Sequence, residues 1–166
     1  MLPLSLGTAV LVRCGHLIGQ KAFRELNKAV STAIILGIVV SAITATLTLL
    51  LREQIASLYT SNPEVIALAS SLLLLACIYQ VTDSVQVICA SILRGMKITK
   101  PTFFITFIAY WPVGFGLGYV LGLTDHIVPA MGVHGFWIGI IFGLTLAALL
   151  LSIVLKKELS RYKQIG

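Results

Sequence analysis

Charge is scarce in this sequence, and that scarcity excludes most soluble proteins. Only 11% of the 166 residues are Asp, Glu, Lys or Arg, whereas a soluble domain usually carries about 25%. Hydrophobic residues make up 58% of the chain, and they come in long blocks. Such blocks are typical of helices that cross a lipid bilayer. The sequence therefore predicts an all-α, polytopic membrane helix bundle, with one membrane domain over residues 1–166.

Cysteine is also rare, and the usual motifs of soluble enzymes are absent. The sequence contains no P-loop, GxSxG, HExxH or CxxC pattern. The three histidines share no ligand spacing. We interpret the three cysteines, Cys14, Cys77 and Cys89, as small buried hydrophobic residues. We therefore expect no enzyme activity, no cofactor and no transition-metal site.

Four apolar blocks are long enough to cross a membrane, which takes about 20 helical residues. They cover about residues 29–51, 65–93, 102–123 and 135–155. The first block, residues 1–12, is too short to span and lacks the flanks of a signal peptide. We interpret it as part of a longer helix. The prediction is thus four complete spans and one truncated N-terminal helix.

The charges between the blocks predict how the chain is oriented. Residues 13–28, 94–100 and 156–166 are basic, whereas residues 52–64 and the loop that contains Asp125 are acidic. This alternation and the positive-inside rule place the basic segments and the C-terminus in the cytoplasm. The net charge of +6 sits in these short clusters, so the expected partner is the lipid bilayer and not nucleic acid.

Asp83 is the residue that points to a function, because it lies inside the block 65–93. Fourteen Leu, Ile and Val residues in that block, at about −0.3 to −0.6 kcal/mol each, outweigh the roughly +3 kcal/mol of one Asp. The block should therefore enter the membrane with its acid. Helical spacing places Tyr79, Asp83 and Gln86 on one face, with Thr82 beside them. An acid within a span is a candidate functional site.

A carboxyl group at that depth can exchange a proton, or a proton for Na⁺, which is the minimal coupling element of an ion-driven transporter. Tyr79 can share a proton or offer its oxygen to a cation, and Gln86 can orient the carboxyl group. Beyond Na⁺ at Asp83 we expect no metal. The alternative is a protonated Asp83 that hydrogen-bonds a neighbouring helix and serves packing alone.

Two further spans carry candidate residues around proline and glycine. Pro112 should kink the span 102–123 and free a carbonyl group. Tyr110 and Trp111, just before it, either face a substrate cavity or pack at the membrane interface. A spacing of small residues in these two spans favours close helix packing; these residues are Gly114, Gly118, Gly135, Gly139 and Gly143.

Arg94 and Gly95 stand at the end of the central span. We interpret Arg94 as a basic anchor at the membrane surface and Gly95 as the C-cap of the helix. The alternative for Arg94 is a contact with lipid phosphate or with a gate.

Five stretches of the sequence carry a resemblance to a known family. They are LPLSLGTAVLVRCGHLIGQ (2–20), LREQIASLYTSNPEV (51–65), IYQVTDSVQVICASILRGMK (78–97), FITFIAYWPVGFGLGYVL (104–121) and GFWIGIIFGLT (135–145). The run Asp-x-x-Gln followed by Leu-Arg-Gly is a specific part of this set. Together these stretches resemble the MATE family of multidrug efflux proteins, NorM type.

The resemblance implies twelve spanning helices in two lobes, of which this chain would supply helices eight to twelve, with helix eight cut. It implies export of cationic, amphipathic drugs in exchange for Na⁺ or H⁺ from a bacterial inner membrane. Asp83 and Tyr79 match the Asp and Tyr of the family's C-lobe cation site. The family's companion Glu lies on helix seven, outside this chain. The missing N-terminal part would then be a partner, and the chain alone should not transport.

Two other functions remain open at this stage. A lipid-linked saccharide flippase has a related architecture, but it usually carries basic residues in its cavity, and the spans here hold none. A small, non-transporting membrane subunit would need no acid at mid-depth. We therefore favour the multidrug exporter over these two alternatives.

Overall fold

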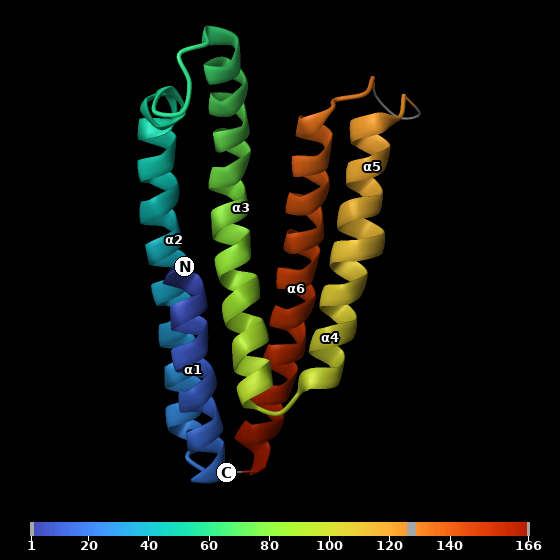
Figure 1. Cartoon of the computed structure of the whole chain (residues 1–166). Helices are drawn as coiled ribbons and strands as arrows, with labels where there is room; N and C mark the ends of the chain where they lie inside the picture. The colour runs from blue at the N-terminus through green and yellow to red at the C-terminus, as the bar shows by residue number, and fades with distance from the viewer. Residues whose placement is uncertain (1, 126–128, 166) are drawn as a thin grey trace.

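The structure, a computed structural model, describes residues 2–125 and 129–165, and these residues form an all-helical bundle (Figure 1). Four of its helical stretches are long and apolar enough to cross a membrane, and a shorter apolar helix precedes them. The predicted all-α membrane bundle is therefore confirmed. Its elements are α1 (Leu2–Gly19), α2 (Phe23–Ser57), α3 (Pro63–Gly95), α4 (Thr99–Ile108), the π-helix η1 (Ala109–Phe115), α5 (Gly116–Leu123) and α6 (Val133–Ile165).

The helices extend beyond the apolar blocks of the sequence. The expectation that residues 13–28 form a charged connection is wrong, because α1 continues to Gly19 and α2 begins at Phe23. Likewise α6 runs to Ile165, beyond the predicted end of its span at residue 155. Hydropathy follows the hydrocarbon layer alone, whereas Lys, Arg and Glu are good helix formers that carry a helix on into the headgroup region. Met1 and Gly166, at the predicted termini, lie outside the described residues.

The ends of α1 and α3 repeat one pattern, Leu-x-Gly-x-Lys. In both, the lysine adopts a left-handed conformation, with φ of 57° at Lys21 and 63° at Lys97. After α3, the N–H of Ile98 donates to the carbonyl of Leu93 at 2.9 Å and the N–H of Lys97 donates to the carbonyl of Arg94 at 3.0 Å. These two bonds form a Schellman motif, in which the left-handed position is usually glycine.

Gly95 is therefore not the C-cap of α3, and that prediction is wrong. The cap residue is Met96, and Gly95 lies within the last helical turn. A Cβ atom at Gly95 would lie 2.5 Å from the carbonyl oxygen of Leu11 in α1. Glycine at this position thus allows the close approach of two helices. Arg94 is exposed and folds back on its own helix, where its Nε donates to the carbonyl of Ala90 at 3.2 Å.

The last two spans meet along facing glycines, as the spacing of small residues predicts. A Cβ atom at Gly135 would lie 2.5 Å from the backbone nitrogen of Gly122, and one at Gly143 would lie 2.5 Å from the carbonyl oxygen of Ala109. Gly139 faces Gly118 in the same way. These contacts bring the backbones of η1 and α5 directly against α6.

The helix α3 lies at the centre of the bundle and packs against α1, α2 and α6 (Figure 1). Its C-terminal half carries the core: Ile88, Ile92 and Leu93 are fully buried. They belong to one cluster with Leu26 of α2 and Leu151 of α6. A buried hydrogen bond from the Ser84 hydroxyl to the carbonyl of Gly37, 3.0 Å long, also ties α3 to α2. The half of α3 that ends at Gly95 is thus held on three sides.

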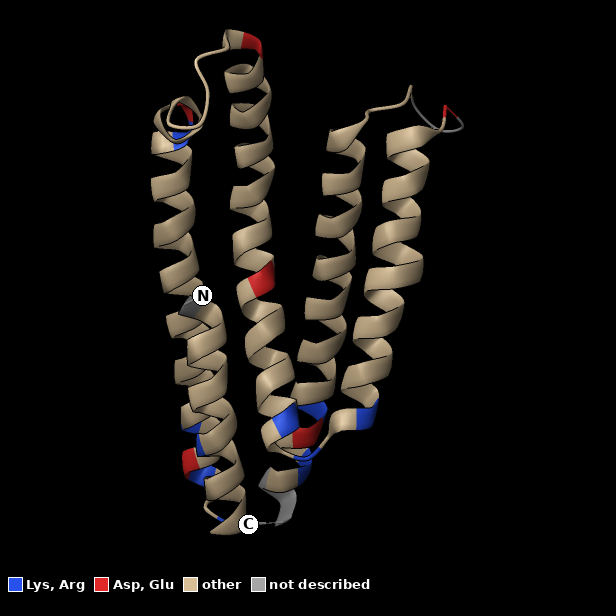
Figure 2. Cartoon of the chain, viewed as in Figure 1, with Lys and Arg blue, Asp and Glu red and all other residues tan. Residues whose placement is uncertain are grey.

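Lysine and arginine gather at one end of the bundle, the end at which α1 joins α2 and α3 joins α4 (Figure 2). At the opposite end, Arg52 of α2 lies near two acids, Glu53 and Glu64. The charge alternation along the sequence has thus become a difference between the two ends of the bundle. We refer to the first of them as the basic end.

Candidate functional site

Asp83 faces a polar cavity in the interior of the bundle. It lies about 18 Å along α3 from Gly95 and about 30 Å from Pro63, at 1.5 Å per residue. The cavity has a volume of about 430 Å³, and residues of three helices line it. Its lining comprises Pro3 of α1, Val40, Ser41 and Thr44 of α2, and Tyr79, Gln80 and Asp83 of α3.

Tyr79 and Asp83 lie one helical turn apart, and both side chains are half-buried at the edge of this cavity. The ring of Tyr79 packs edge-to-face on Trp137 of α6, with 6.0 Å between centroids and an interplanar angle of 82°. Such aromatic pairs contribute about 0.5–1.5 kcal/mol beyond their buried area. Trp137 therefore fixes the ring of Tyr79 beside the carboxyl group.

The other polar atoms of the cavity are neutral oxygens and one amide. The hydroxyl group of Thr44 donates to the carbonyls of Val40 and Ser41, at 3.1 and 3.0 Å, and the Ser41 hydroxyl donates to the carbonyl of Ile38 at 3.0 Å. A hydroxyl that donates its proton to the backbone still has lone pairs with which to accept or to coordinate. These hydroxyl oxygens therefore have acceptor capacity to spare. They lie beside Asp83, the one carboxylate among the described residues that line the cavity.

The oxygen set suits a proton or a monovalent cation. Hard cations prefer carboxylate, carbonyl and hydroxyl oxygens. The cavity offers one negative charge together with neutral oxygens. Among residues 2–125 and 129–165, no three His, Cys, Asp or Glu side chains cluster as they would around a multivalent metal. Within that part of the chain, the chemistry of the donors fits an exchangeable H⁺ or Na⁺ at Asp83.

The sequence predicts that Gln86 lies beside Asp83, whereas the structure places Gln80 in the lining of the cavity. Gln86 is buried one turn nearer the basic end and does not line the cavity, and no hydrogen bond joins it to Asp83. Gln80 does line the cavity, and its Nε2 donates to the hydroxyl of Thr48 in α2 at 3.2 Å. Helical spacing from Asp83 admits both residues to the same broad face. Only the position of α2 decides between them.

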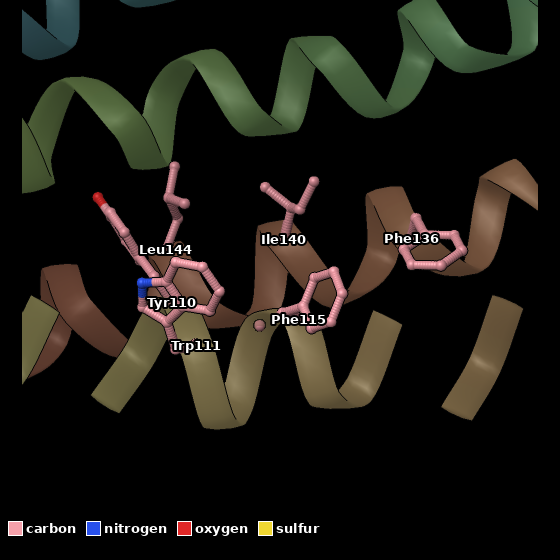
Figure 3. Close-up of a pocket in the computed structure, with 7 residues that line it drawn as sticks. Tyr110, Trp111, Phe115, Phe136, Ile140 and Leu144 are labelled. Atoms are coloured by element: carbon pink, nitrogen blue, oxygen red, sulfur yellow. The ribbon is translucent and has the colours of Figure 1, made fainter. Parts of the chain in front are cut away.

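Tyr110 and Trp111 line a second, mainly apolar cavity of about 360 Å³ between η1 and α6 (Figure 3). Phe115, Phe136 and Ile140 complete its aromatic and aliphatic walls. In Figure 3 the Tyr110 hydroxyl points toward α3, and Tyr110 lies within electrostatic range of Asp83 and Tyr79. The aromatic cavity and the carboxylate are therefore neighbours.

Pro112 lies inside the π-helix that shapes this cavity. Proline has no N–H to donate and its ring clashes with the carbonyl group four residues earlier. The chain adopts a wider turn here, in which the N–H of Gly116 bonds to the carbonyl of Trp111. Short π-helical segments are frequent at functional sites. The turn carries Tyr110, Trp111 and Phe115, and the close-up shows all three beside the residues of α6 (Figure 3).

Four apolar spans define a multi-pass membrane protein, and two of them, α2 and α3, line a polar cavity that contains Asp83 and suits a cation. The chain belongs to the MatE family, whose model matches residues 1–120. It is 49% identical over 151 residues to the multidrug resistance protein MdtK of Photorhabdus laumondii, and 51% identical over 151 residues to that of Yersinia pestis. Each alignment covers 91% of this chain and 33% of the relative. The chain thus spans about a third of the length of these relatives.

Solved structures share the fold. The eukaryotic MATE transporter AtDTX14 superposes with a TM-score of 0.84 at 23% identity, over 98% of this chain and 36% of that one. An inward-facing multidrug resistance MATE family transporter gives 0.83 at 20% identity, over 95% and 36%. The family membership that the sequence motifs indicate is confirmed by the family model and by the relatives, and the solved structures show that the fold is shared.

Proposed function

We propose that this chain is the C-terminal part of a bacterial multidrug efflux transporter that exchanges cationic, amphipathic drugs for Na⁺ or H⁺ across the inner membrane. The relatives at 49 and 51% identity carry the name multidrug resistance protein. The observation that carries the proposal is Asp83, a carboxylate that lines a polar cavity deep inside a spanning helix. An acid within a membrane span is energetically costly, and such residues are therefore rare outside functional sites.

The coupling step is a competition for Asp83. When a proton or Na⁺ neutralises the carboxylate, its charge no longer favours a bound cationic drug, and the conformational equilibrium of the protein shifts. Tyr79 assists by offering its phenolic oxygen to the ion. Ser41 and Thr44 supply neutral oxygens from α2 on the other side of the cavity.

The drug site that we propose is the aromatic cavity of Tyr110 and Trp111. Aromatic faces attract organic cations, with about 0.5–2 kcal/mol per contact. The carboxylate of Asp83 lies within electrostatic range of Tyr110. The binding free energy of a cationic drug in this cavity would therefore depend on whether Asp83 is charged, and this dependence links the two sites.

The test replaces Asp83 in the full-length protein, reconstituted in liposomes with an imposed proton or Na⁺ gradient. We expect Asp83→Asn to abolish gradient-driven ethidium export while Asp83→Glu retains part of it. Asp125→Asn makes the same chemical change in an exposed loop, and it should leave export unchanged. Normal export by Asp83→Asn at equal protein levels would refute the proposal. Loss of export by Asp83→Asn would also exclude a non-transporting subunit.

A second experiment tests whether the chain acts alone. Residues 1–166 are expressed without further sequence in a drug-sensitive bacterial strain. We expect no gain in resistance to ethidium or norfloxacin. The chain spans about a third of the length of its relatives, and it would supply only one side of a transport cavity. Raised resistance would contradict the requirement for an N-terminal part.

A further inference from the structure

A groove between α2 and α6 opens at the basic end, away from the cavity of Asp83. Its volume is about 330 Å³. The two helices flank α3 there without closing on each other, and fully or nearly fully buried side chains form the floor: Val30 of α2, Cys89 of α3 and Leu155 of α6. The groove is therefore a hollow that reaches the core of the bundle.

The groove is polar at its outer end and apolar further in. Asn27, Lys156 and Ser160 lie at the outer end, where α2 begins and α6 leaves the predicted span. About 10 Å deeper, at 1.5 Å per residue, Ile34 lines the wall. One turn beyond it on the same face, Ile38 is exposed. A ligand that fits would have a polar head followed by an apolar chain.

The basic end, into which the outer part of the groove opens, has an excess of cationic side chains, and among the described residues Lys156 is the one that lines the groove. Two of the basic residues here pair with the two acids of this end: Arg13 with Glu25 at 3.9 Å, and Arg161 with Glu158 at 3.2 Å. Within the part of the chain that the structure describes, the remaining cationic side chains of this end have no acidic partner. They are Lys21, Arg24, Lys28, Arg94, Lys97, Lys100, Lys156 and Lys157.

We propose that this groove binds an anionic phospholipid, with the phosphate group at Lys156 and Ser160 and an acyl chain along Ile34 and Ile38. The ammonium group of Lys156 is a suitable donor to phosphate oxygens, and the Ser160 hydroxyl, which donates to the carbonyl of Lys156 at 2.9 Å in this structure, would turn to donate to the phosphate. A basic residue near an anionic membrane surface contributes about 1 kcal/mol to lipid binding. The proposal requires only that the protein spans a membrane, so it stands or falls independently of the transport function.

Native mass spectrometry of the protein in its natural full length measures this binding. The probes are palmitoyl-oleoyl phosphatidylglycerol and palmitoyl-oleoyl phosphatidylcholine, which share their acyl chains and differ in charge. We expect phosphatidylglycerol to bind about fivefold tighter or more, as one lysine-phosphate contact implies. Equal affinity for the two lipids would overturn the proposal.

Two neighbouring lysines provide a matched pair of variants. Both lysines are exposed, but Lys156 lines the groove and Lys157 lies outside its lining. We expect Lys156→Gln to weaken phosphatidylglycerol binding about fivefold and Lys157→Gln less than twofold. An equal effect of both variants would show a diffuse surface charge and no site, which contradicts the proposal.

Two further measurements identify the occupant. Ser31→Phe adds a ring at the groove wall without changing charge, and it should reduce phosphatidylglycerol binding as strongly as Lys156→Gln. Unchanged binding in this variant would place the lipid elsewhere. Millimolar inorganic phosphate should fail to displace phosphatidylglycerol. Complete displacement would mean that the groove takes free phosphate, and the lipid proposal would be wrong.

Discussion

Both parts of α3 are mainly apolar, but their surroundings are very different. From Ser84 to Leu93, which we call the closed half, nearly every side chain is buried. From Pro63 to Asp83, which we call the open half, Ser70 is the one buried side chain among the described residues. The helix α1 explains much of this difference, because it runs beside the half near the basic end only (Figure 1). Asp83 lies at the boundary between the two halves. A carboxylate there is deep in the membrane and still reaches a cavity.

The first prediction concerns glycine at the end of the closed half. Gly95→Ala should destabilise the protein by about 2–3 kcal/mol, because the new Cβ would overlap the carbonyl oxygen of Leu11. Gly19 occupies the same place in the Leu-x-Gly-x-Lys pattern of α1 but has no atom within 4 Å of its Cβ position. Gly19→Ala should therefore stabilise by up to about 1 kcal/mol. Unfolding in mixed detergent micelles measures both, and effects of the same sign would contradict the packing described.

A pair of aliphatic truncations compares the halves directly. Ile88→Ala should cost about 2 kcal/mol, because it leaves a cavity in a fully buried site. Leu74→Ala, in the open half, should cost less than about 0.5 kcal/mol, because lipid tails are as apolar as the side chain they replace. The same unfolding measurement decides. Equal losses would mean that the open half is packed as tightly as the closed one.

Two substitutions at hydroxyl-bearing residues, two positions apart, test the boundary at Asp83. Ser84→Ala removes a buried hydrogen bond from α3 to Gly37 of α2 and should cost about 1 kcal/mol. The Thr82 hydroxyl bonds only within its own helix, to the carbonyls of Ile78 and Tyr79. Thr82→Ser keeps that hydroxyl and should change stability by less than about 0.5 kcal/mol. A larger loss from Thr82→Ser than from Ser84→Ala would reverse the assignment of the two halves.

A small stabilising effect is expected at the left-handed lysine, Lys97, that follows the closed half. Lys97→Gly should stabilise by roughly 0.5–1 kcal/mol, because glycine adopts a positive φ without a steric penalty. Lys100→Gly, inside the first turn of α4, removes the same charge from a helical position and should destabilise by a similar amount. If both variants lowered stability, the lysine charge and not the backbone conformation would dominate.

The sequence predicts the parts of this molecule that depend on local chemistry. Apolar blocks identify the four spans, the spacing of small residues indicates close helix packing, and the single acid in the block 65–93 identifies Asp83 as a candidate site residue. Each of these signals lies within a few turns of one helix. The expected helix ends were wrong because hydropathy does not register charged helical turns outside the hydrocarbon layer.

The parts that depend on neighbouring helices could not be predicted. Gln86 lies on nearly the same face of α3 as Tyr79. It is about 4.5 Å along the helix from Asp83 toward the basic end, where other helices enclose α3. Gln80 became a cavity residue only because Thr48 of α2 lies opposite it. The sequence predicts Gly95 as a helix cap, whereas in the structure Gly95 allows α1 to pass closely at Leu11. Distances between helices decide these roles, and a single sequence does not contain them.

The central claim is that the carboxyl group of Asp83 exchanges H⁺ or Na⁺. Infrared difference spectroscopy of the full-length protein, titrated with pH and with Na⁺, measures this directly through the stretching band of a protonated carboxyl group. The account predicts a carboxyl band that responds to one of these ions in the wild type and is absent from Asp83→Asn. The same response in Asp83→Asn, or no response in either protein, would contradict the account.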